Sequence, residues 1–229
     1  MRRRPTVASP SAVEAGDPDA SGSPDASALA AGSLALQEAR EGGPDLKTSP
    51  TPAAAFRAAR RTFLRCERLD MRALALDLGI SRATLYRWTG DRDQLLSDVL
   101  WSLSDDLFEQ AKLATTHLRG TERLLEIFRR HVQALIDARA LRVLLQQETH
   151  AALRILTARD GGVQPRTVQR LAALYREEQE AGNFKPAVDV HTLAYAVVRV
   201  TEGFIYNDTV VAVEPEVERA AAIVSLLLR

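Results

Sequence analysis

MRALALDLGISRATLYRWTGDRDQLL, residues 71–96, is the stretch that decides the fold of this chain. Apolar and small residues follow a helical period up to Leu78, the period breaks at Gly79, and a second short helical stripe follows Ser81. Glycine suits the left-handed end of a helix, and a serine hydroxyl can cap the first free N–H groups of the next helix. Helices this short are unstable alone, so they need each other and a third helix. The stretch therefore predicts a helix, a tight turn and a second helix.

The second of these helices is expected to have two different faces. Leu85 should lie in the core together with Leu74 and Leu78 of the first helix. The opposite face holds hydrogen-bond donors and a flat ring, which do not suit a core and indicate contact with another molecule. These outward residues are Arg82, Thr84, Arg87 and Trp88.

Positive charge is concentrated around this stretch. Residues 57–92 contain nine arginines and four acidic residues, a net charge of +5, whereas the whole chain has a net charge of zero. The remaining residues must therefore sum to −5. A basic module on an otherwise acidic chain points to a polyanion as the partner of that module.

Length and composition favour a cytoplasmic protein. With 229 residues the chain can form one large or two small domains, and a hydrophobic content of 46% is sufficient for a core. Cys66 is the single cysteine, which fits a reducing compartment. No apolar run approaches the roughly 18 residues of a membrane span. Prolines and serines follow Arg2–Arg4 where a signal peptide would need an apolar core.

The first fifty residues differ in composition from the rest. With six prolines, five glycines and few large apolar residues, they cannot bury enough surface to offset the entropy of ordering. Residues 1–50 are therefore expected to form a disordered tail, with a transient helix around Ala28 to Arg40 as the alternative for part of it. Order should begin at Thr51 and Pro52, a capping residue followed by a proline in the first helical turn.

Helical patterns continue to the end of the chain. Capping residues and apolar stripes predict about nine helices and no strand, which is an all-α fold. The fourth helix, from Arg92 to about Thr116, would be roughly 35 Å long, enough to connect a head to a separate body. We expect the head over residues 51–96 and the body over residues 97–229. The later helices should begin near Gly120, Leu141, Pro165, Asp189 and Pro215.

The last two predicted helices are apolar on more than one side. A helix at the end of a small domain cannot bury two faces against its own domain, so the spare face should meet a second copy of the chain. The result would be a four-helix interface in a homodimer. The residues assigned to this interface are Leu193, Val197, Val200, Phe204, Val217, Ala220, Val224 and Leu227.

The residues of the central stretch resemble the helix-turn-helix signature of the TetR family of transcriptional regulators. The resemblance rests on Ile80–Trp88 followed by Gly90–Leu96. Within these ranges Leu85 and Tyr86 match the family's near-invariant pair, and Arg92 stands where the family has a lysine at the start of its fourth helix. The tryptophan and the Gly-Asp-Arg-Asp sequence further resemble the QsdR-type subgroup, whose namesake regulates a lactone-degrading pathway.

The resemblance implies a sequence-specific DNA-binding regulator of transcription, with a ligand-responsive repressor as the better-supported form. As a two-fold homodimer it would bind a pseudo-palindromic operator with recognition helices about 34 Å apart, or a multiple of one helical turn. Arginine can donate a bidentate pair of hydrogen bonds to guanine, and small apolar groups can pack on a thymine methyl. The resemblance assigns base contacts to Arg82, Ala83, Thr84 and Arg87, and phosphate contacts to Tyr86, Trp88 and Arg92.

The resemblance also implies an effector pocket inside the body, filled by a small hydrophobic or lactone-like molecule. A few polar groups set in an apolar cavity are the usual form of such a site. No cofactor, metal or catalytic residue is implied. The candidate lining residues are Trp101, Phe108, Phe128, His131, Gln147, His150, Tyr175, Tyr195 and Arg199, with Glu148 and Glu202 as further polar candidates.

Two other interpretations remain open. Asp105, Asp106 and Glu109 lie at i, i+1 and i+4 on a helix and resemble the acidic motif of all-helical terpenoid synthases, in which carboxylates hold Mg2+. A helical adaptor that keeps the fold without binding DNA is the second alternative. The presence of Arg82, Tyr86 and Arg92 argues against the adaptor.

Overall fold

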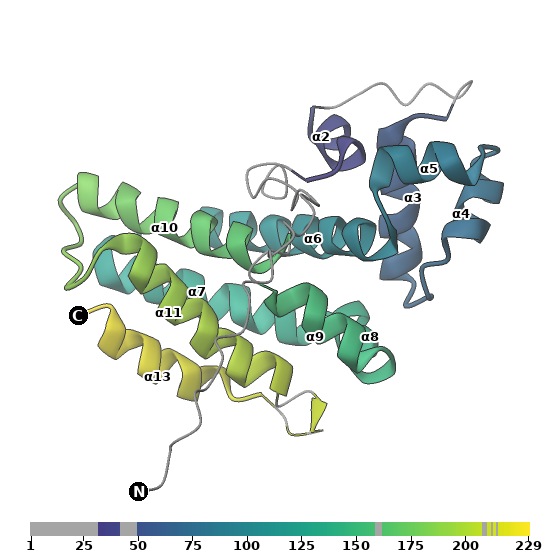
Figure 1. Cartoon of the computed structure of the whole chain (residues 1–229). Coiled ribbons are helices and arrows are strands. Elements are labelled where there is room, and N and C mark those ends of the chain that lie inside the picture. Colours follow the sequence, from purple (N-terminus) through teal and green to yellow (C-terminus); the bar gives the residue numbers. More distant parts are fainter. Residues whose placement is uncertain (1–31, 42–49, 159–161, 208–209, 212, 214) are drawn as a thin grey trace, which may run out of the picture.

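The computed structural model describes residues 32–41, 50–158, 162–207, 210–211, 213 and 215–229. All regular structure within these residues is helical, so the predicted all-α class is confirmed. A small group of helices forms one end of the molecule and a longer bundle forms the other (Figure 1). The helices are α2 (Leu34–Arg40), α3 (Pro52–Leu64), α4 (Met71–Asp77), α5 (Arg82–Thr89), α6 (Arg92–Ala114), α7 (Gly120–Asp137), α8 (Arg139–Gln147), α9 (Thr149–Thr157), α10 (Gln164–Glu180), α11 (Val190–Glu202), the π-helical segment η1 (Gly203–Asn207) and α13 (Val217–Leu227).

The described residues form eleven α-helices, so the predicted number of about nine was too low. One additional helix is α2. The other arises because the helix expected around Leu141 is divided at Glu148 into α8 and α9. Glu148 has φ −127° and ψ 42°, outside the helical region. Its carboxylate accepts a hydrogen bond of 2.7 Å from Arg92, so the division lies where the body contacts the start of α6.

Helices α3, α4 and α5 form the head, with the local geometry that the sequence predicted. The Asp70 carboxylate caps α4 by accepting hydrogen bonds from the first backbone N–H groups, and Ser81 Oγ caps α5 in the same way. Between the two helices Gly79 has φ +67°, which favours glycine. Phe56 of α3 and Leu85 of α5 are buried in the core that joins the three helices.

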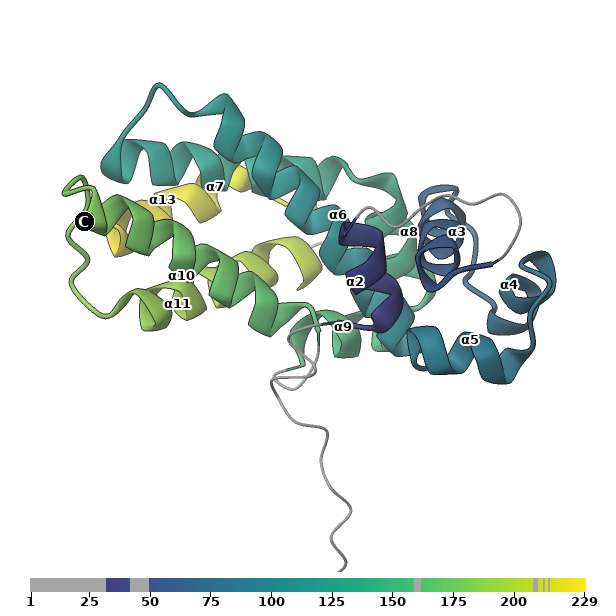
Figure 2. The same ribbon diagram turned by 90° about the horizontal axis from the view of Figure 1, so that it is seen from above.

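Helix α6 is shared between the head and the body. Leu95 and Val99 are fully buried in a core that the head shares with α8 and α9, whereas Phe108 and Ala111 are buried in the core of the bundle. Figure 2 shows α6 running from the head into the bundle of α7, α10, α11 and α13. Because closely packed cores adjust in discrete steps, a shift of one end of α6 must be accommodated at the other.

No helix among the described residues has the length and apolar character needed to cross a membrane.

Helix α2 corrects the expectation of a disordered tail for residues 32–41. Ala35 and Leu36 have exposures of 0% and 1% because they pack into the core of the head. Ser33 Oγ accepts a hydrogen bond from the N–H of Leu36 and caps the helix. Two apolar residues and a cap are sufficient here because a packing surface is already present. The remainder of residues 1–50, apart from Pro50, lies outside the described residues.

Gly120 occupies a position that only glycine fits. Its φ is +56°, and a Cβ added to it would lie 2.4 Å from the backbone oxygen of Asn183. We expect Gly120→Ala to lower the free energy of unfolding by about 2–4 kcal/mol, because left-handed strain and steric overlap add. Urea denaturation followed by circular dichroism measures this loss.

The matched control is Gly182→Ala. Gly182 also has a left-handed φ, +74°, but a Cβ added to it would have no neighbour within 4 Å in the described part of the chain. Its substitution should therefore show only the backbone strain, about 1–2 kcal/mol. Equal losses in the two variants would contradict the close approach at Gly120.

Candidate nucleic-acid interface and internal cavity

Helix α5 presents a polar face to solvent and an apolar face to the core. Leu85 and Thr89 both have an exposure of 0%. The four predicted base-contact residues, by contrast, lie on the accessible side of the helix. Arg82, Ala83 and Arg87 are exposed and Thr84 is partly buried, with its hydroxyl 3.0 Å from Ser81 Oγ.

A basic concavity of about 290 Å³ opens beside α5. Its rim combines arginines from the α3–α4 loop, from α4 and from the start of both α5 and α6. Guanidinium groups grouped in this way suit phosphate oxygens. Sequence reasoning missed two of these arginines, Arg68 and Arg72, although both belong to the basic module. The lining residues are Arg68, Leu69, Asp70, Met71, Arg72, Arg82, Tyr86 and Arg92.

Two of the three predicted phosphate contacts are engaged inside the protein. Arg92 Nε donates to the carbonyl oxygen of Leu69 at 2.8 Å, and Arg92 Nη2 donates to Glu148 at 2.7 Å. Trp88 is partly buried against the core of the head. Only Tyr86, with an exposure of 46%, is presented freely to solvent. Arg92 therefore joins the head to the α8–α9 junction, because a partly buried carboxylate attracts its guanidinium.

The residues predicted to meet a second copy pack, fully or partly buried, against the core of one chain. Their apolar faces hold α7, α11 and α13 together, which leaves little of them accessible to a partner. The apolar side chains that α13 exposes are instead Ile223 and Leu226, with exposures of 39% and 62%. Of the predicted set, Leu193, Val197, Ala220 and Val224 have exposures of at most 2%, and Val200, Phe204, Val217 and Leu227 are partly buried against the same core.

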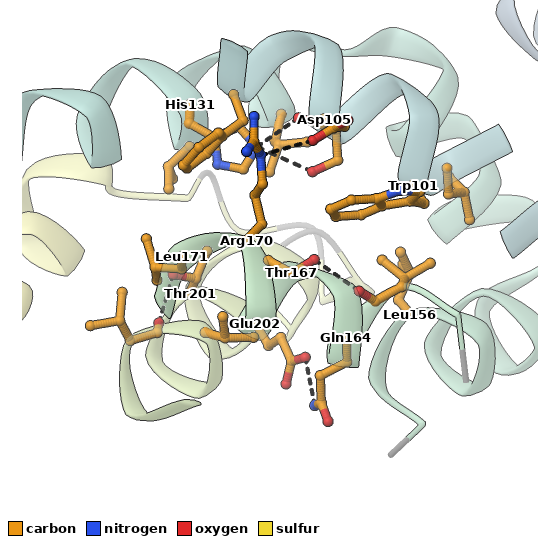
Figure 3. A pocket seen from close by; sticks show the side chains of 18 of the residues that line it. Trp101, Asp105, His131, Leu156, Gln164, Thr167, Arg170, Leu171, Thr201 and Glu202 are labelled. Atoms are coloured by element: carbon orange, nitrogen blue, oxygen red, sulfur yellow. Dashed lines mark hydrogen bonds and ion pairs between the residues drawn. The ribbon is translucent and has the colours of Figure 1, made fainter. Parts of the chain in front are cut away.

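A cavity of about 80 Å³ lies among α6, α7, α10 and α11. Figure 3 shows Arg170 pointing toward Asp105, and Gln164 paired with Glu202, among apolar side chains. Four of the predicted residues line this cavity, namely Trp101, Phe108, Phe128 and His131. The other five do not line it: Gln147, His150 and Arg199 are exposed, Tyr175 packs on Phe184 in the core, and Tyr195 is partly buried outside the cavity.

The charged groups of the cavity are already paired. Arg170 contacts Asp105 at 3.1 Å and also contacts Glu109. Glu202 accepts hydrogen bonds from Gln164 at 2.9 Å and from Arg199 at 2.6 Å. Burial raises the pKa of Glu202, although both partners oppose the change. Arg170 and Gln164 were missed because the sequence does not reveal which face of α10 turns inward.

The acidic run Asp105, Asp106 and Glu109 does not form a metal site. Asp106 accepts a hydrogen bond from Arg60, while Arg170 contacts both Asp105 and Glu109. No cluster of three potential metal ligands occurs among the described residues. Arginines thus neutralise the carboxylates that the enzyme interpretation required.

Comparison with known proteins agrees with this geometry. Residues 119–229 match the family model of the tetracyclin repressor-like C-terminal domain. The transcriptional repressor QsdR of R. erythropolis, a TetR-family protein, matches with a TM-score of 0.71 and 28% identity, over 77% of this chain and 93% of that chain. The fatty acid degradation regulator FadR of Bacillus halodurans is similar to this chain in fold alone. Its TM-score is 0.51 and its identity is 17%, over 80% of this chain and 96% of that chain. No curated protein matches the chain.

The fold, the exposed recognition helix and these matches define a helix-turn-helix DNA-binding regulator of transcription. Residues 119–229 carry the tetracyclin repressor-like C-terminal domain, and the fold of the chain is similar to that of the TetR-family repressor QsdR.

The partly buried ring of His131, which lines the cavity, makes the stability of the body depend on pH. Its Nε2 lies 3.1 Å from Ser104 Oγ, and burial lowers the pKa of the ring from 6.5 to about 4. As the pH falls, His131 is therefore protonated in the unfolded chain at a higher pH than in the folded protein. The associated stability is complete above pH 6.5 and is lost as the pH falls toward 4.

We expect the free energy of unfolding of the unchanged protein to fall by about 2 kcal/mol more between pH 7 and pH 5 than that of His131→Asn. Urea denaturation at the two pH values measures the difference. Replacing the exposed His117 by asparagine is the control and should leave the pH dependence unchanged. A pH dependence unaffected by His131→Asn would show that this ring is not the group that titrates.

Proposed function

We propose that this protein is an effector-responsive repressor that binds a pseudo-palindromic operator as a homodimer. The proposal rests on the accessible face of α5, which lies beside a basic concavity and is supported by the core of the head. The repressor activity named for QsdR supports the direction of regulation. Residues 51–96 are proposed as the reading head and residues 97–229 as the effector-binding and dimerisation body.

In this proposal Arg82, Ala83, Thr84 and Arg87 reach base edges in the major groove. Arg87 lies on the exposed side of α5 opposite Leu85, so its guanidinium is available for a bidentate pair with guanine. Arg68, Arg72 and Tyr86 surround the concavity beside it and suit the sugar-phosphate backbone. Arg92 is proposed to act indirectly, because its hydrogen bond to Glu148 holds the head against the body.

The exposed apolar side of α13 is the proposed dimer contact. Ile223 and Leu226 lie one turn apart on this helix, next to the exposed Ala222. Paired across a two-fold axis, these side chains would bury the apolar area that they now expose to water. The two recognition helices would then face successive major grooves, about 34 Å apart.

The cavity between α6 and α10 is the proposed effector site. Because its acidic and basic groups already neutralise one another, an uncharged, mostly apolar molecule fits it better than an ion. A lactone-like compound has this character. The volume of about 80 Å³ is small, so a larger effector must push α6 and α10 apart. Movement of α6 would change the spacing of the two heads and release the operator.

Selection of bound sequences from a random pool of DNA duplexes tests the proposed function. We expect enrichment of an inverted repeat whose half-site centres lie about one helical turn, or a multiple of it, apart. Failure to enrich any such repeat at low ionic strength would favour a helical adaptor over a regulator.

Arg87→Ala and Arg72→Ala separate the two kinds of DNA contact. Arg87→Ala is expected to reduce discrimination between operator and random DNA by about 1–3 kcal/mol, since a base contact is lost. Arg72→Ala should weaken binding to both duplexes equally and lower the salt slope by about one, since a phosphate contact is lost. Fluorescence anisotropy over a salt series measures both effects. An equal loss on both duplexes for Arg87→Ala would refute its assignment to a base.

Charge placed on the outer side of α13 is expected to abolish the dimer. Leu226→Glu should shift the protein to a monomer in analytical ultracentrifugation and weaken operator binding at least tenfold, because two linked heads bind far more tightly than one. Leu113→Glu is the control, since Leu113 is equally apolar and 69% exposed, but near the end of α6. A Leu226→Glu protein that remains dimeric would exclude this surface as the interface.

A further inference from the structure

Helix α2 contacts the head at the same time as the body. It packs against α3 and α5, and Ala35 and Leu36 are buried in the core of the head. Figures 1 and 2 show α2 lying beside the first half of α6 and next to α3 and α5. It therefore touches the recognition helix and the connecting helix together.

The last residue of α2 reaches the wall of the cavity. Arg40 Nη2 donates a hydrogen bond of 2.7 Å to Asp105 Oδ2, and its guanidinium lies 5.8 Å from the centre of the Trp101 ring. Both of these partners line the cavity. The other carboxylate oxygen of Asp105 faces Arg170 at 3.1 Å. Arg40 and Arg170 thus hold one carboxylate from opposite sides, one from α2 and one from inside the cavity.

The first turn of α2 makes a second, more deeply buried connection. The backbone N–H of Ser33 donates to Asp98 Oδ2 at 2.9 Å, and Asp98 Oδ1 accepts from Arg166 at 3.0 Å. The side chains of Asp98 and Arg166 are 0% and 3% exposed. Arg166 belongs to the same helical turn of α10 as Gln164 and Thr167, which line the cavity. Separating the partners of such a buried ion pair is strongly unfavourable, because it leaves a buried charge without a partner.

We propose that α2 is a component of the effector site, with Arg40 as a positioning residue for Trp101 and Asp105, and that it carries the state of the cavity to the recognition helix. The inference rests on the proposed function, because it adds a second route to the one through α6. A molecule that separates α10 from α6 disturbs Asp105 and Asp98, which together hold both ends of α2. Helix α2 then loosens its packing on α5.

Fluorine NMR of protein labelled with 5-fluorotryptophan tests the cavity end of this route. Trp88 and Trp101 are the two tryptophans, so Trp101→Phe assigns the resonances. Because coupling between sites is reciprocal, binding of the selected DNA duplex should shift the Trp101 resonance. In Arg40→Ala this DNA-induced shift of Trp101 should fall at least threefold. The reason is that the variant loses the ion pair with Asp105 and the cation–π contact with Trp101.

Arg142→Ala is the matched control, because Arg142 is an exposed arginine of α8 whose side chain makes no hydrogen bond or ion pair with the described residues. It should keep the full DNA-induced shift of Trp101. A shift that persists in Arg40→Ala, or that is absent from the unchanged protein while it binds DNA, would overturn the proposal.

A pair of substitutions at Ser33 tests the other end without DNA. Ser33 has φ −67°, which proline can adopt, so Ser33→Pro removes the N–H donor to Asp98 without straining φ. Ser33→Ala removes the capping hydroxyl and keeps that N–H. Hydrogen exchange of the α2 amides should be about tenfold faster in Ser33→Pro than in Ser33→Ala, since a hydrogen bond to a buried carboxylate is lost.

The Ser33 pair also distinguishes the two proposals. Ser33→Pro should displace the Trp101 resonance of the DNA-free protein, whereas Ser33→Ala should leave it near its original position. An unchanged Trp101 resonance together with equal exchange rates would overturn the role of α2, whatever the DNA results are. Failure to bind any duplex would count against the proposed function, and the Ser33 pair would still decide whether α2 and the cavity are connected.

Discussion

The double burial of α6 is the constraint on which the rest of this structure depends. Its first half is packed in the core that the head shares with α8 and α9, and its second half is packed in the core of the bundle. Neither half can move as an independent rigid body without opening a packed interface. The geometry required of a switch is therefore present before any ligand or DNA is considered, because one helix belongs to both cores.

Ion pairs at the junction reinforce this constraint and alter the electrostatics of the head. Glu148 holds Arg92 at 2.7 Å and lies 3.7 Å from Arg68, and Asp106 holds Arg60. The basic module of the sequence is thus partly neutralised by acidic groups of the body. Arg72 and Arg82 at the concavity and Arg87 on α5 are exposed, which leaves their charge on the surface that would face DNA.

Ion pairing also explains why the cavity is mostly apolar. Charged side chains enter it from α6, α10 and α11, yet each contacts a group of opposite charge. What remains accessible is mostly apolar, with neutral hydrogen-bonding groups such as Gln164, Thr201 and the unprotonated ring of His131. A site built in this way selects its ligand by shape and hydrogen bonds rather than by net charge.

The sequence by itself determined the all-α class, the helix-turn-helix and its caps, because these follow from local periodicity and from residues such as Gly79 and Ser81. It also identified four aromatic or imidazole groups of the cavity: Trp101, Phe108, Phe128 and His131. Only the tertiary structure decided which apolar face of α11 and α13 is internal, and that Arg92 is held by Glu148. The same holds for α2, which folds against a surface supplied by other parts of the chain. Periodicity shows that a helix has an apolar face, but contacts distant in sequence decide what that face meets.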